Sequence, residues 1–176
     1  MKAVFVTEFG GVDTLRYEEL PTPAVRAGQA LVKVKAIGVN FIDIYFRTGL
    51  YPAEPPVILG MEAAGVVEAV ASDVVNVKPG DRVAFGTVRG AYAEYAAIAA
   101  SQLVKLPEAI DYKMAAASML QGMTAHYLTH STFPLQPGQS CLVHAAAGGA
   151  GQWIVAAAKR RGARVIGTTS TKEKAA

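Results

Sequence analysis

The residues with the clearest chemical potential are seven small ones at 145–151, which read Ala-Ala-Ala-Gly-Gly-Ala-Gly. Their spacing matches the dinucleotide fingerprint G-x-G-x-x-G in the relaxed form A-x-x-G-x-x-G, on Ala145, Gly148 and Gly151. Small residues let the backbone turn tightly and approach a pyrophosphate, and a helix that follows offers unpaired N–H groups to the anion. The run therefore predicts a dinucleotide site. The alternative is a tight turn with close helix–strand packing and no ligand.

The residues after this loop favour NADPH over NADH. An NAD-preferring site usually carries Asp or Glu about 20 residues after the glycines, where it binds the ribose 2′-hydroxyl. Counting from Gly148 leads to a Thr-Thr-Ser run at 168–170, and Lys172 and Lys174 follow it. Hydroxyl and ammonium groups suit a 2′-phosphate. The alternative is a solvated helix start in which Glu173 weakens the positive charge.

The elements around the loop predict a βαβ unit. An apolar strand is expected at 140–144 and an apolar helix at 152–161, with a β-branched strand at 164–169. Upstream of this unit, Asp111 is expected to cap a helix from Tyr112 to about Met119. A second helical stretch is expected at 122–131.

The first hundred residues predict short strands broken by Gly and Pro, which is typical of a compact β-rich or barrel-like domain. Apolar and polar residues alternate at 29–37, the period-2 pattern of a half-buried strand. Further strands are expected at 2–7, 63–70, 82–85 and 91–99.

Composition limits the classes of function. The chain has 176 residues, 52% of them hydrophobic and 18% charged, so it is not of the disordered type. The net charge of +3 comes from scattered residues without a basic stripe, which argues against a nucleic-acid partner. The first ten residues do not resemble a signal peptide, and no apolar run reaches the ~18 residues of a membrane helix. A cytoplasmic protein without membrane partners is expected.

The C-terminal residues 171–176 read as the first turn of a helix, at which the sequence stops. A single βαβ unit cannot form a parallel sheet that is covered on both faces. We therefore expect this chain to be a fragment of a longer protein.

Four segments together resemble the quinone oxidoreductase (zeta-crystallin-like) family of the medium-chain dehydrogenase/reductase superfamily. They are 39–52 (VNFIDIYFRTGLYP), 59–67 (LGMEAAGVV), 78–83 (KPGDRV) and 144–151 (HAAAGGAG), the last with Ala150 where the family commonly has Val. The resemblance covers essentially the whole chain.

The resemblance implies α+β and α/β architecture: a GroES-like β-rich barrel domain at 1–120, then the start of a doubly wound Rossmann domain at 121–176. It implies reduction of quinones or activated alkenes by NADPH in a protein that is usually a homodimer. Zinc-dependent relatives carry Cys at the position of Asn40 and His at that of Met61. Because neither Asn nor Met is a good zinc ligand, a metal-free site is expected.

The resemblance also implies roles for individual residues. Asn40, Tyr45 and Tyr51 are the catalytic candidates, with the two tyrosines as hydrogen-bond donors to a substrate carbonyl. The expected cofactor-binding residues are Phe41, Ile42, Asp43, Tyr45, Gln121, Thr124, Tyr127, Gly148, Gly149, Ala150, Gly151, Ser170 and Lys174. Ordinary packing at a domain edge is the alternative for both tyrosines.

Other signals predict less. His126 and His130 are four residues apart, but the metalloprotease pattern needs Glu after the first His, and Tyr127 is there. Cys141, the single cysteine, is expected to be a buried inert thiol. Two further functions stay open: a non-catalytic interaction module, and an enoyl thioester reductase.

Overall fold

The structure is a computed structural model that describes residues 1–175. The chain divides into two compact units, Met1–Met119 and Leu120–Ala176. Each unit has a hydrophobic core of its own. Among residues 1–175, no helix combines the length and the apolar character needed to cross a bilayer.

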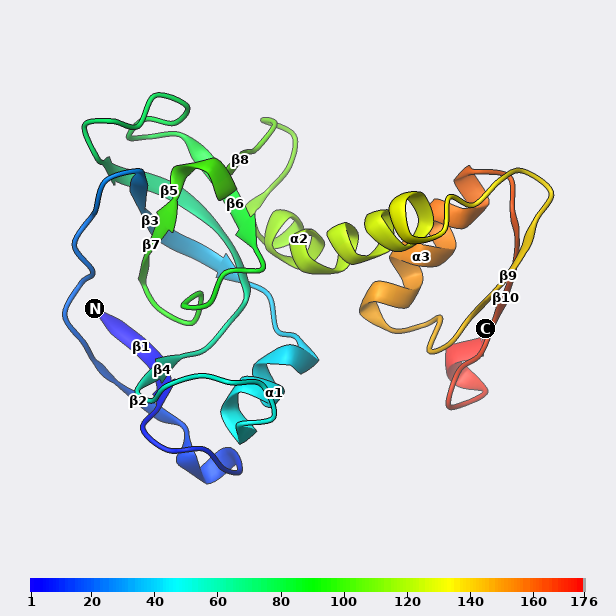
Figure 1. Cartoon of the computed structure of the whole chain (residues 1–176), viewed down its shortest axis with the longest axis horizontal. Helices are drawn as coiled ribbons and strands as arrows, with labels where there is room; N and C mark the ends of the chain where they lie inside the picture. The colour runs from blue at the N-terminus through cyan, green and yellow to red at the C-terminus, as the bar shows by residue number, and fades with distance from the viewer. Residues whose placement is uncertain (176) are drawn as a thin grey trace. The chain divides into compact units, whose positions relative to one another are not determined.

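The first unit contains two antiparallel sheets (Figure 1). The larger has the strand order β7-β3-β5-β6-β8, and the smaller has the order β2-β1-β4. The strands are β1 (Lys2–Val6), β2 (Arg16–Glu19), β3 (Gln29–Ile37), β4 (Val57–Ile58), β5 (Glu62–Val70), β6 (Arg82–Gly86), β7 (Tyr95–Ala99) and β8 (Val104–Lys105). Two 3-10 turns lie at Val12–Thr14 and Ala100–Gln102.

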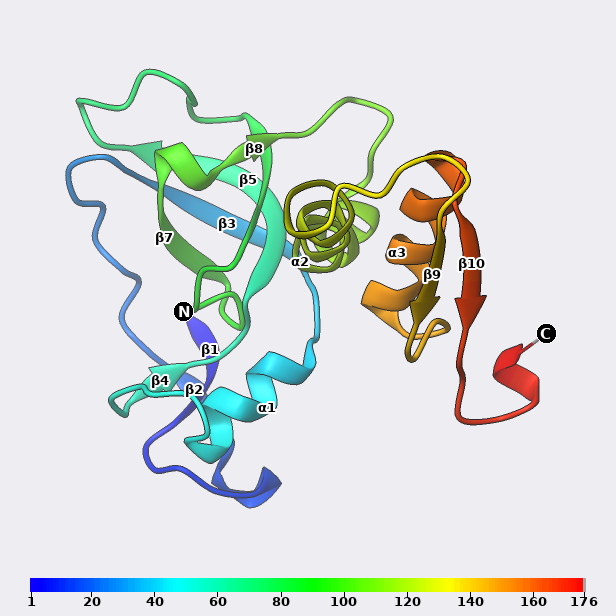
Figure 2. The same ribbon diagram turned by 45° about the vertical axis from the view of Figure 1, so that its right-hand side comes forward.

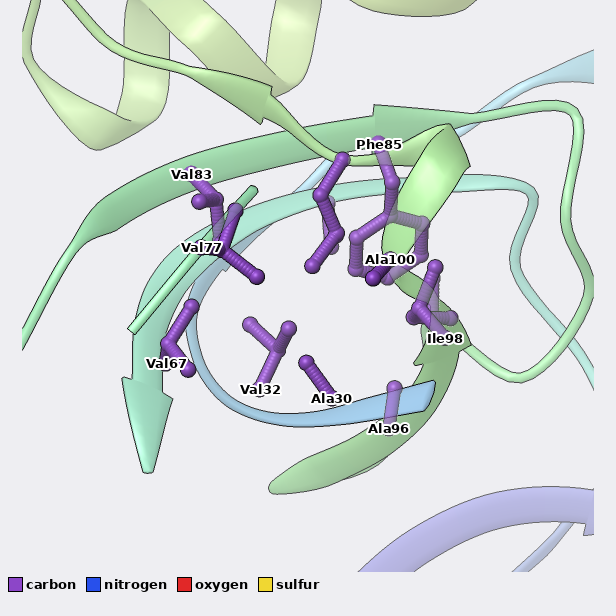
Figure 3. Close-up of a cluster of buried hydrophobic side chains, with 12 residues drawn as sticks. Ala30, Val32, Val67, Val77, Val83, Phe85, Ala96, Ile98 and Ala100 are labelled. Carbon is purple, nitrogen blue, oxygen red and sulfur yellow. The ribbon is translucent and has the colours of Figure 1, made fainter. Parts of the chain in front are cut away.

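The larger sheet curls around the main core. Val32, Val67 and Phe85 are almost completely buried and point into the space that the strands enclose, as Figure 3 shows. Fully burying such a side chain contributes about 1.5–3 kcal/mol, so this cluster holds the curled sheet closed. The register between β3 and β5 shifts at two places, which bends the strands. A Cβ on Gly65 would overlap the Lys33 carbonyl, so β5 needs glycine there to approach β3.

Most strands lie where the sequence predicts them, and β3 matches its expected bounds. The strand expected at 91–99 starts only at Tyr95. The reason is local: the N–H groups of Ala91 and Tyr92 donate to the carbonyls of Gly60 and Leu59 and so belong to a turn.

Helix α1 (Phe41–Thr48) was not expected from the sequence. Its β-branched and aromatic residues favour strand, but its ends carry strong helix signals. Asn40 and Asp43 form a capping box at the N-terminus, and Gly49 closes the C-terminus in the left-handed region with φ +75°. The caps outweigh the weak helix propensity of the body.

Helix α2 (Tyr112–Tyr127) corrects the expectation of two separate helices. It runs through Gly122 without a break and continues as a π-helical turn at Leu128–Thr132. An isolated glycine costs a helix only about 1 kcal/mol, which is too little to end it. The expected cap is confirmed, because the Met114 N–H donates to Asp111 Oδ1 at 2.7 Å.

The second unit contains the expected βαβ arrangement. Strands β9 (Ser140–Val143) and β10 (Arg164–Gly167) pair in parallel, and helix α3 (Gly149–Arg160) packs beside them (Figure 2). The helix begins inside the glycine run, three residues before the expected position, and β10 ends two residues early. A 3-10 turn at Glu173–Ala175 is the only helical part of the expected C-terminal turn within the described residues; Ala176 lies outside them.

Candidate cofactor and substrate sites

The glycine loop is packed so tightly that larger residues cannot replace its key members. A Cβ on Gly151 would overlap the Ala145 carbonyl and lie 2.8 Å from Ala146 Cα. A Cβ on Gly148 would lie 3.1 Å from the Ala145 oxygen. Ala145 itself has φ +51°, a strained conformation that turns the chain sharply after β9. The contacts of Gly151 show the close packing of helix against turn that the last glycine of the dinucleotide fingerprint allows.

The start of α3 supplies donors at this turn. The first N–H groups of a helix have no intrahelical acceptor, and here they belong to Gly149, Ala150 and Gly151. The helix dipole adds partial positive charge at the same place. The loop can therefore hold an anionic group such as a pyrophosphate.

The segment after β10 is fastened to the same loop. The Ala146 N–H donates to the Thr168 carbonyl at 2.9 Å, and the Thr168 N–H donates to the Val143 carbonyl at 3.0 Å. His144 Nδ1 lies 3.1 Å from Thr168 Oγ1. The carboxyl ends of both parallel strands are thus joined, which is the usual place of a ligand in an open α/β sheet.

Two of the residues predicted to read a 2′-phosphate are neighbours. Lys174 Nζ donates to Ser170 Oγ at 3.5 Å, and both side chains are accessible to solvent. The Lys174 N–H also donates to Thr171 Oγ1 at 3.4 Å. An ammonium and hydroxyl groups therefore lie together shortly after β10, where they can bind a phosphate monoester.

The predicted α2 residues differ in their surroundings. Gln121 lies against the start of α3, since a Cβ on Gly149 would come within 2.7 Å of Gln121 Nε2. The Thr124 hydroxyl donates to the Leu120 carbonyl of its own helix at 2.7 Å. Tyr127 is half exposed at the end of α2. Of the three, Gln121 is the one that the structure brings to the glycine loop.

In the first unit, the structure brings the two candidate tyrosines together. The ring centroids of Tyr45 and Tyr51 are 5.4 Å apart, and the Tyr51 N–H donates to the Tyr45 carbonyl at 3.1 Å. The ring of Phe46 meets Tyr51 edge-on at 5.6 Å. Both hydroxyls belong to partly exposed side chains, so they can reach a substrate carbonyl.

Asn40 is held from two sides. Its Nδ2 donates to Glu62 Oε1 at 2.7 Å, and its backbone N–H donates to Asp43 Oδ2 at 2.8 Å. Glu62 is completely buried, so its carboxylate cannot turn into solvent. The orientation of the Asn40 amide is therefore fixed by the fold.

Asp43 belongs to a buried network that sequence reasoning did not find. It is only 5% exposed, and its Oδ2 also accepts a 2.7 Å hydrogen bond from the Tyr92 hydroxyl. Burial raises the pKa of Asp43, partly offset by its hydrogen bonds with Asn40 and Tyr92. Burial also raises the pKa of Tyr92, and the neighbouring Asp43 carboxylate adds to that increase. Tyr92 thus stays protonated, and its hydroxyl donates a hydrogen bond to Asp43.

Asp43 lines a pocket of about 400 Å³ within the first unit. The pocket is mostly apolar, and its lining comprises Leu15, Val39, Asn40, Phe41, Asp43, Ile44, Arg47, Leu59 and Tyr92. Phe41 and Ile42 were predicted at the cofactor. Phe41 lies on the rim of this pocket and is 77% exposed, and Ile42 is half-buried.

Glu62, Tyr92 and Arg47 are the residues that sequence reasoning missed. Glu62 gave a partial signal, because it is the first residue of a strand that is apolar or glycine everywhere else except at Glu68. Tyr92 gave no signal, because its partner Asp43 is 49 positions away in the sequence. Arg47 gave none, because it lies on α1, a helix that was not expected.

Residues 1–175 contain no group of three or more His, Cys, Asp or Glu side chains that could hold a metal ion. The rings of His126 and His130 are stacked, with their centroids 4.2 Å apart. His130 Nδ1 lies within hydrogen-bond distance, 3.0 Å, of the His126 carbonyl oxygen. These contacts stay within one helical segment. Cys141 is half-buried and not fully buried as expected.

Comparison with protein families gives one match, at residues 26–108, to the alcohol dehydrogenase GroES-like domain. Among curated proteins, the chain is 46% identical over 176 residues to a quinone oxidoreductase of Pseudomonas aeruginosa. That alignment covers 99% of this chain and 54% of the relative. The chain thus spans about half the length of the curated relatives it matches.

Two solved structures are very similar to this one. A mycobacterial protein complexed with NADPH has a TM-score of 0.96 and 46% identity, over 99% of this chain and 55% of the other. The quinone oxidoreductase of Escherichia coli complexed with NADPH has a TM-score of 0.96 and 41% identity, over 99% and 54%. These matches confirm the predicted fold class, a GroES-like unit followed by the beginning of a Rossmann fold.

Proposed function

The chain belongs to the quinone oxidoreductase family of the medium-chain dehydrogenase/reductase superfamily, and on this premise we propose that its protein reduces quinones or enones with NADPH. The observation that carries the proposal is the tight glycine loop with Ser170 and Lys174 after the next strand. Solved relatives of the same fold are complexes with NADPH.

The residues present fit this cofactor. Overlap of a Cβ on Gly151 with the loop backbone means that this position needs glycine, as the last position of the dinucleotide fingerprint does. Gly148, Gly149, Ala150 and Gly151 would hold the pyrophosphate, and Ser170 and Lys174 the 2′-phosphate. When bound, NADPH supplies the hydride.

The first unit would supply the substrate contacts. Tyr45 and Tyr51 are paired and partly exposed, and a tyrosine donates a hydrogen bond at neutral pH without becoming charged. Either hydroxyl can therefore stabilise the oxygen of a carbonyl on which negative charge develops. The fixed amide of Asn40, the N-cap residue of α1, is a third polar group.

We propose that this chemistry needs no zinc. Asn40 and Met61 occupy the positions where zinc-dependent relatives carry ligands, and amide and thioether are poor ligands for zinc. Polarisation of the substrate carbonyl then falls to hydrogen bonds. The family also motivates a homodimer for the whole protein, and the division into a catalytic domain at 1–120 and a cofactor domain from 121 onward.

The first experiment is titration of the 176-residue chain with NADPH and with NADH. Tighter binding of NADPH is expected, because only NADPH carries the 2′-phosphate. Lys174→Gln should weaken NADPH binding about tenfold, the value of one charge-assisted hydrogen bond, and should leave NADH unchanged. Lys113→Gln removes an equally exposed charge from the first unit and serves as the control.

A chain that binds NADH as tightly as NADPH would contradict the cofactor assignment. Equal effects of the two lysine variants would show that general charge, and not Lys174, determines the affinity. Reduction of 1,4-benzoquinone and of a crotonyl thioester by the whole protein then separates quinone reductase from enoyl thioester reductase.

A further inference from the structure

Charged side chains are divided unequally between the two units. Residues 120–176 carry six Lys and Arg side chains against a single acidic one, Glu173, so the second unit has a net side-chain charge of +5. The first unit carries 11 basic against 13 acidic side chains, a net charge of −2. The modest total of +3 is therefore the sum of a negative unit and a strongly positive one, and the positive unit contains the glycine loop.

Half of the basic side chains of the second unit lie far from the predicted cofactor contacts. Lys159 and Arg160 end α3, and Arg164 begins β10; we call these three residues the distal cluster. Helix α3 has 12 residues, which at about 1.5 Å per residue places its end about 18 Å from its start at the loop. In Figure 2 the end of α3 and the start of β10 are at the top of the unit, and the loop between β9 and α3 is at the bottom.

The charges of the distal cluster are not neutralised within the unit. All three side chains are exposed. The salt bridge found among residues 1–175 joins Lys105 to Asp81 in the first unit, and Glu173 follows the other end of β10. Arg161 is different, because it is half-buried and its Nε donates to the Leu135 carbonyl at 2.7 Å. Arg161 therefore belongs to the packing of the fold, whereas the distal cluster faces solvent.

Stabilisation of α3 does not account for the whole cluster. Cations at the C-terminus of a helix interact favourably with its dipole, which suits Lys159 and Arg160. Arg164 lies in a strand, and strands have only small net dipoles. A helix dipole also gives no reason for the absence of acidic residues from 120 to 172. The excess of positive charge is thus a property of the unit and not of one helix end.

We propose that the distal cluster acts on the cofactor at a distance: its electric field draws anions toward the glycine loop and speeds the capture of NADPH, without contact with the bound cofactor. NADPH carries about four negative charges on its pyrophosphate and 2′-phosphate. A positive potential raises the association rate of such an anion, and this effect falls steeply with ionic strength. The identity of the anion rests on the proposed function, whereas the field at the loop does not.

The size of the effect follows from Coulomb's law in water. At about 10 mM salt the Debye length is about 30 Å, and three charges about 18 Å away raise the encounter rate of an ion with four charges about tenfold. At about 0.15 M salt the Debye length is about 8 Å, and the same charges raise the rate less than about twofold. Salt dependence therefore distinguishes distant charges from a direct contact.

The test is stopped-flow mixing of the chain with NADPH, followed by the fluorescence of Trp153, the single tryptophan and a residue of α3. The triple variant Lys159→Gln, Arg160→Gln and Arg164→Gln should associate about tenfold more slowly at about 10 mM salt, but less than about twofold more slowly at about 0.15 M. Its dissociation rate constant should stay the same, because the distal cluster does not touch the bound cofactor. A purely structural role of the cluster would not produce this dependence on salt.

The matched control is the triple variant Arg26→Gln, Lys78→Gln and Lys113→Gln. These three residues are exposed and belong to the first unit, so the control removes the same number of positive charges from the chain. Its association rate should stay close to that of the wild type at both salt concentrations. Equal slowing in the two triple variants would overturn the proposal, as would slowing of the distal-cluster variant that does not change with salt.

A measurement without NADPH separates this proposal from the cofactor assignment. Two soluble nitroxides, one with a carboxylate and one with an ammonium group, broaden amide NMR signals according to how often each approaches them. At about 10 mM salt the ratio of broadening by the anion to broadening by the cation, at the amides of Gly149 and Gly151, should fall about threefold in the distal-cluster variant. An unchanged ratio overturns the proposal whether or not NADPH binds. The expected fall in a chain that does not bind NADPH supports the field and contradicts the cofactor assignment alone.

Discussion

Gly38→Ala tests whether Glu62 is rigidly held beneath Asn40. A Cβ on Gly38 would overlap Glu62 Oε1 and lie 2.5 Å from Glu62 Cγ. Because Glu62 is completely buried, its carboxylate has no solvent to move into. The substitution must therefore shift the backbone or break the 2.7 Å hydrogen bond from Asn40 Nδ2.

The cost follows from these contacts. Overpacking in a core costs about 1–3 kcal/mol, and loss of a hydrogen bond to a charged group costs about 1.5–3 kcal/mol. The gain from a less flexible unfolded chain offsets about 0.4–1 kcal/mol. Since a shift of the backbone relieves part of the overlap, we expect a net loss of about 2–4 kcal/mol in the free energy of unfolding.

The assay is urea unfolding followed by near-ultraviolet circular dichroism of tyrosine. Of the 7 tyrosines, all but Tyr127 lie in the first unit, whereas the single tryptophan, Trp153, lies in the second. Tyrosine signals therefore report on the unit that carries the substitution. Gly11→Ala is the control, because Gly11 has φ −73° and open space around it.

Equal stability of Gly38→Ala and Gly11→Ala would refute the reasoning. It would mean that Glu62 moves at little cost, and then Glu62 could not fix the orientation of Asn40. A large loss seen by Trp153 but not by the tyrosines would contradict it as well.

Three further predictions follow from single residues. Gly122→Ala should raise the free energy of unfolding by about 0.5–1 kcal/mol in urea melts, since Gly122 is inside α2 with nothing within 4 Å of an added Cβ; destabilisation would contradict this. Gly151→Ala should abolish NADPH binding in the titration above, because its Cβ overlaps the Ala145 carbonyl, and unchanged affinity would contradict the predicted loop. Burial raises the pKa of Asp43, so the folded state keeps this proton to higher pH than the unfolded chain does, and the stability gained is lost as pH rises through the folded pKa. Asn does not titrate, so Asp43→Asn lacks this loss. In urea melts from about pH 4 to about pH 7, the free energy of unfolding of the wild type should therefore fall relative to that of the variant. A difference between the two that stays constant with pH would refute the raised pKa.

Local pattern was sufficient for much of the fold. The alternation at 29–37 predicts β3 because a strand exposes one face and buries the other. The small residues at 145–151 predict the turn between β9 and α3, since few other residues allow such close packing. The missing acid near Ser170, and the lysine that follows, are likewise readable from the sequence.

Local pattern failed where short-range signals compete. The body of α1 favours strand, and only the cap formed by Asn40 and Asp43 with Gly49 makes it a helix. Two helical stretches are predicted where α2 is one helix, and the cost of Gly122 inside it is smaller than the stabilisation that the intact helix provides.

The sequence by itself determined the family, the strand pattern of the first unit and the glycine loop of the second, because each depends on neighbours along the chain. Only the tertiary structure decided that Asp43 accepts from Tyr92, 49 positions away, and that Asn40 is held by Glu62, 22 positions away. It also decided that Asp43 and Arg47 line one mostly apolar pocket. Burial and hydrogen bonding between distant segments arise only when the chain is folded, and so no local pattern encodes them.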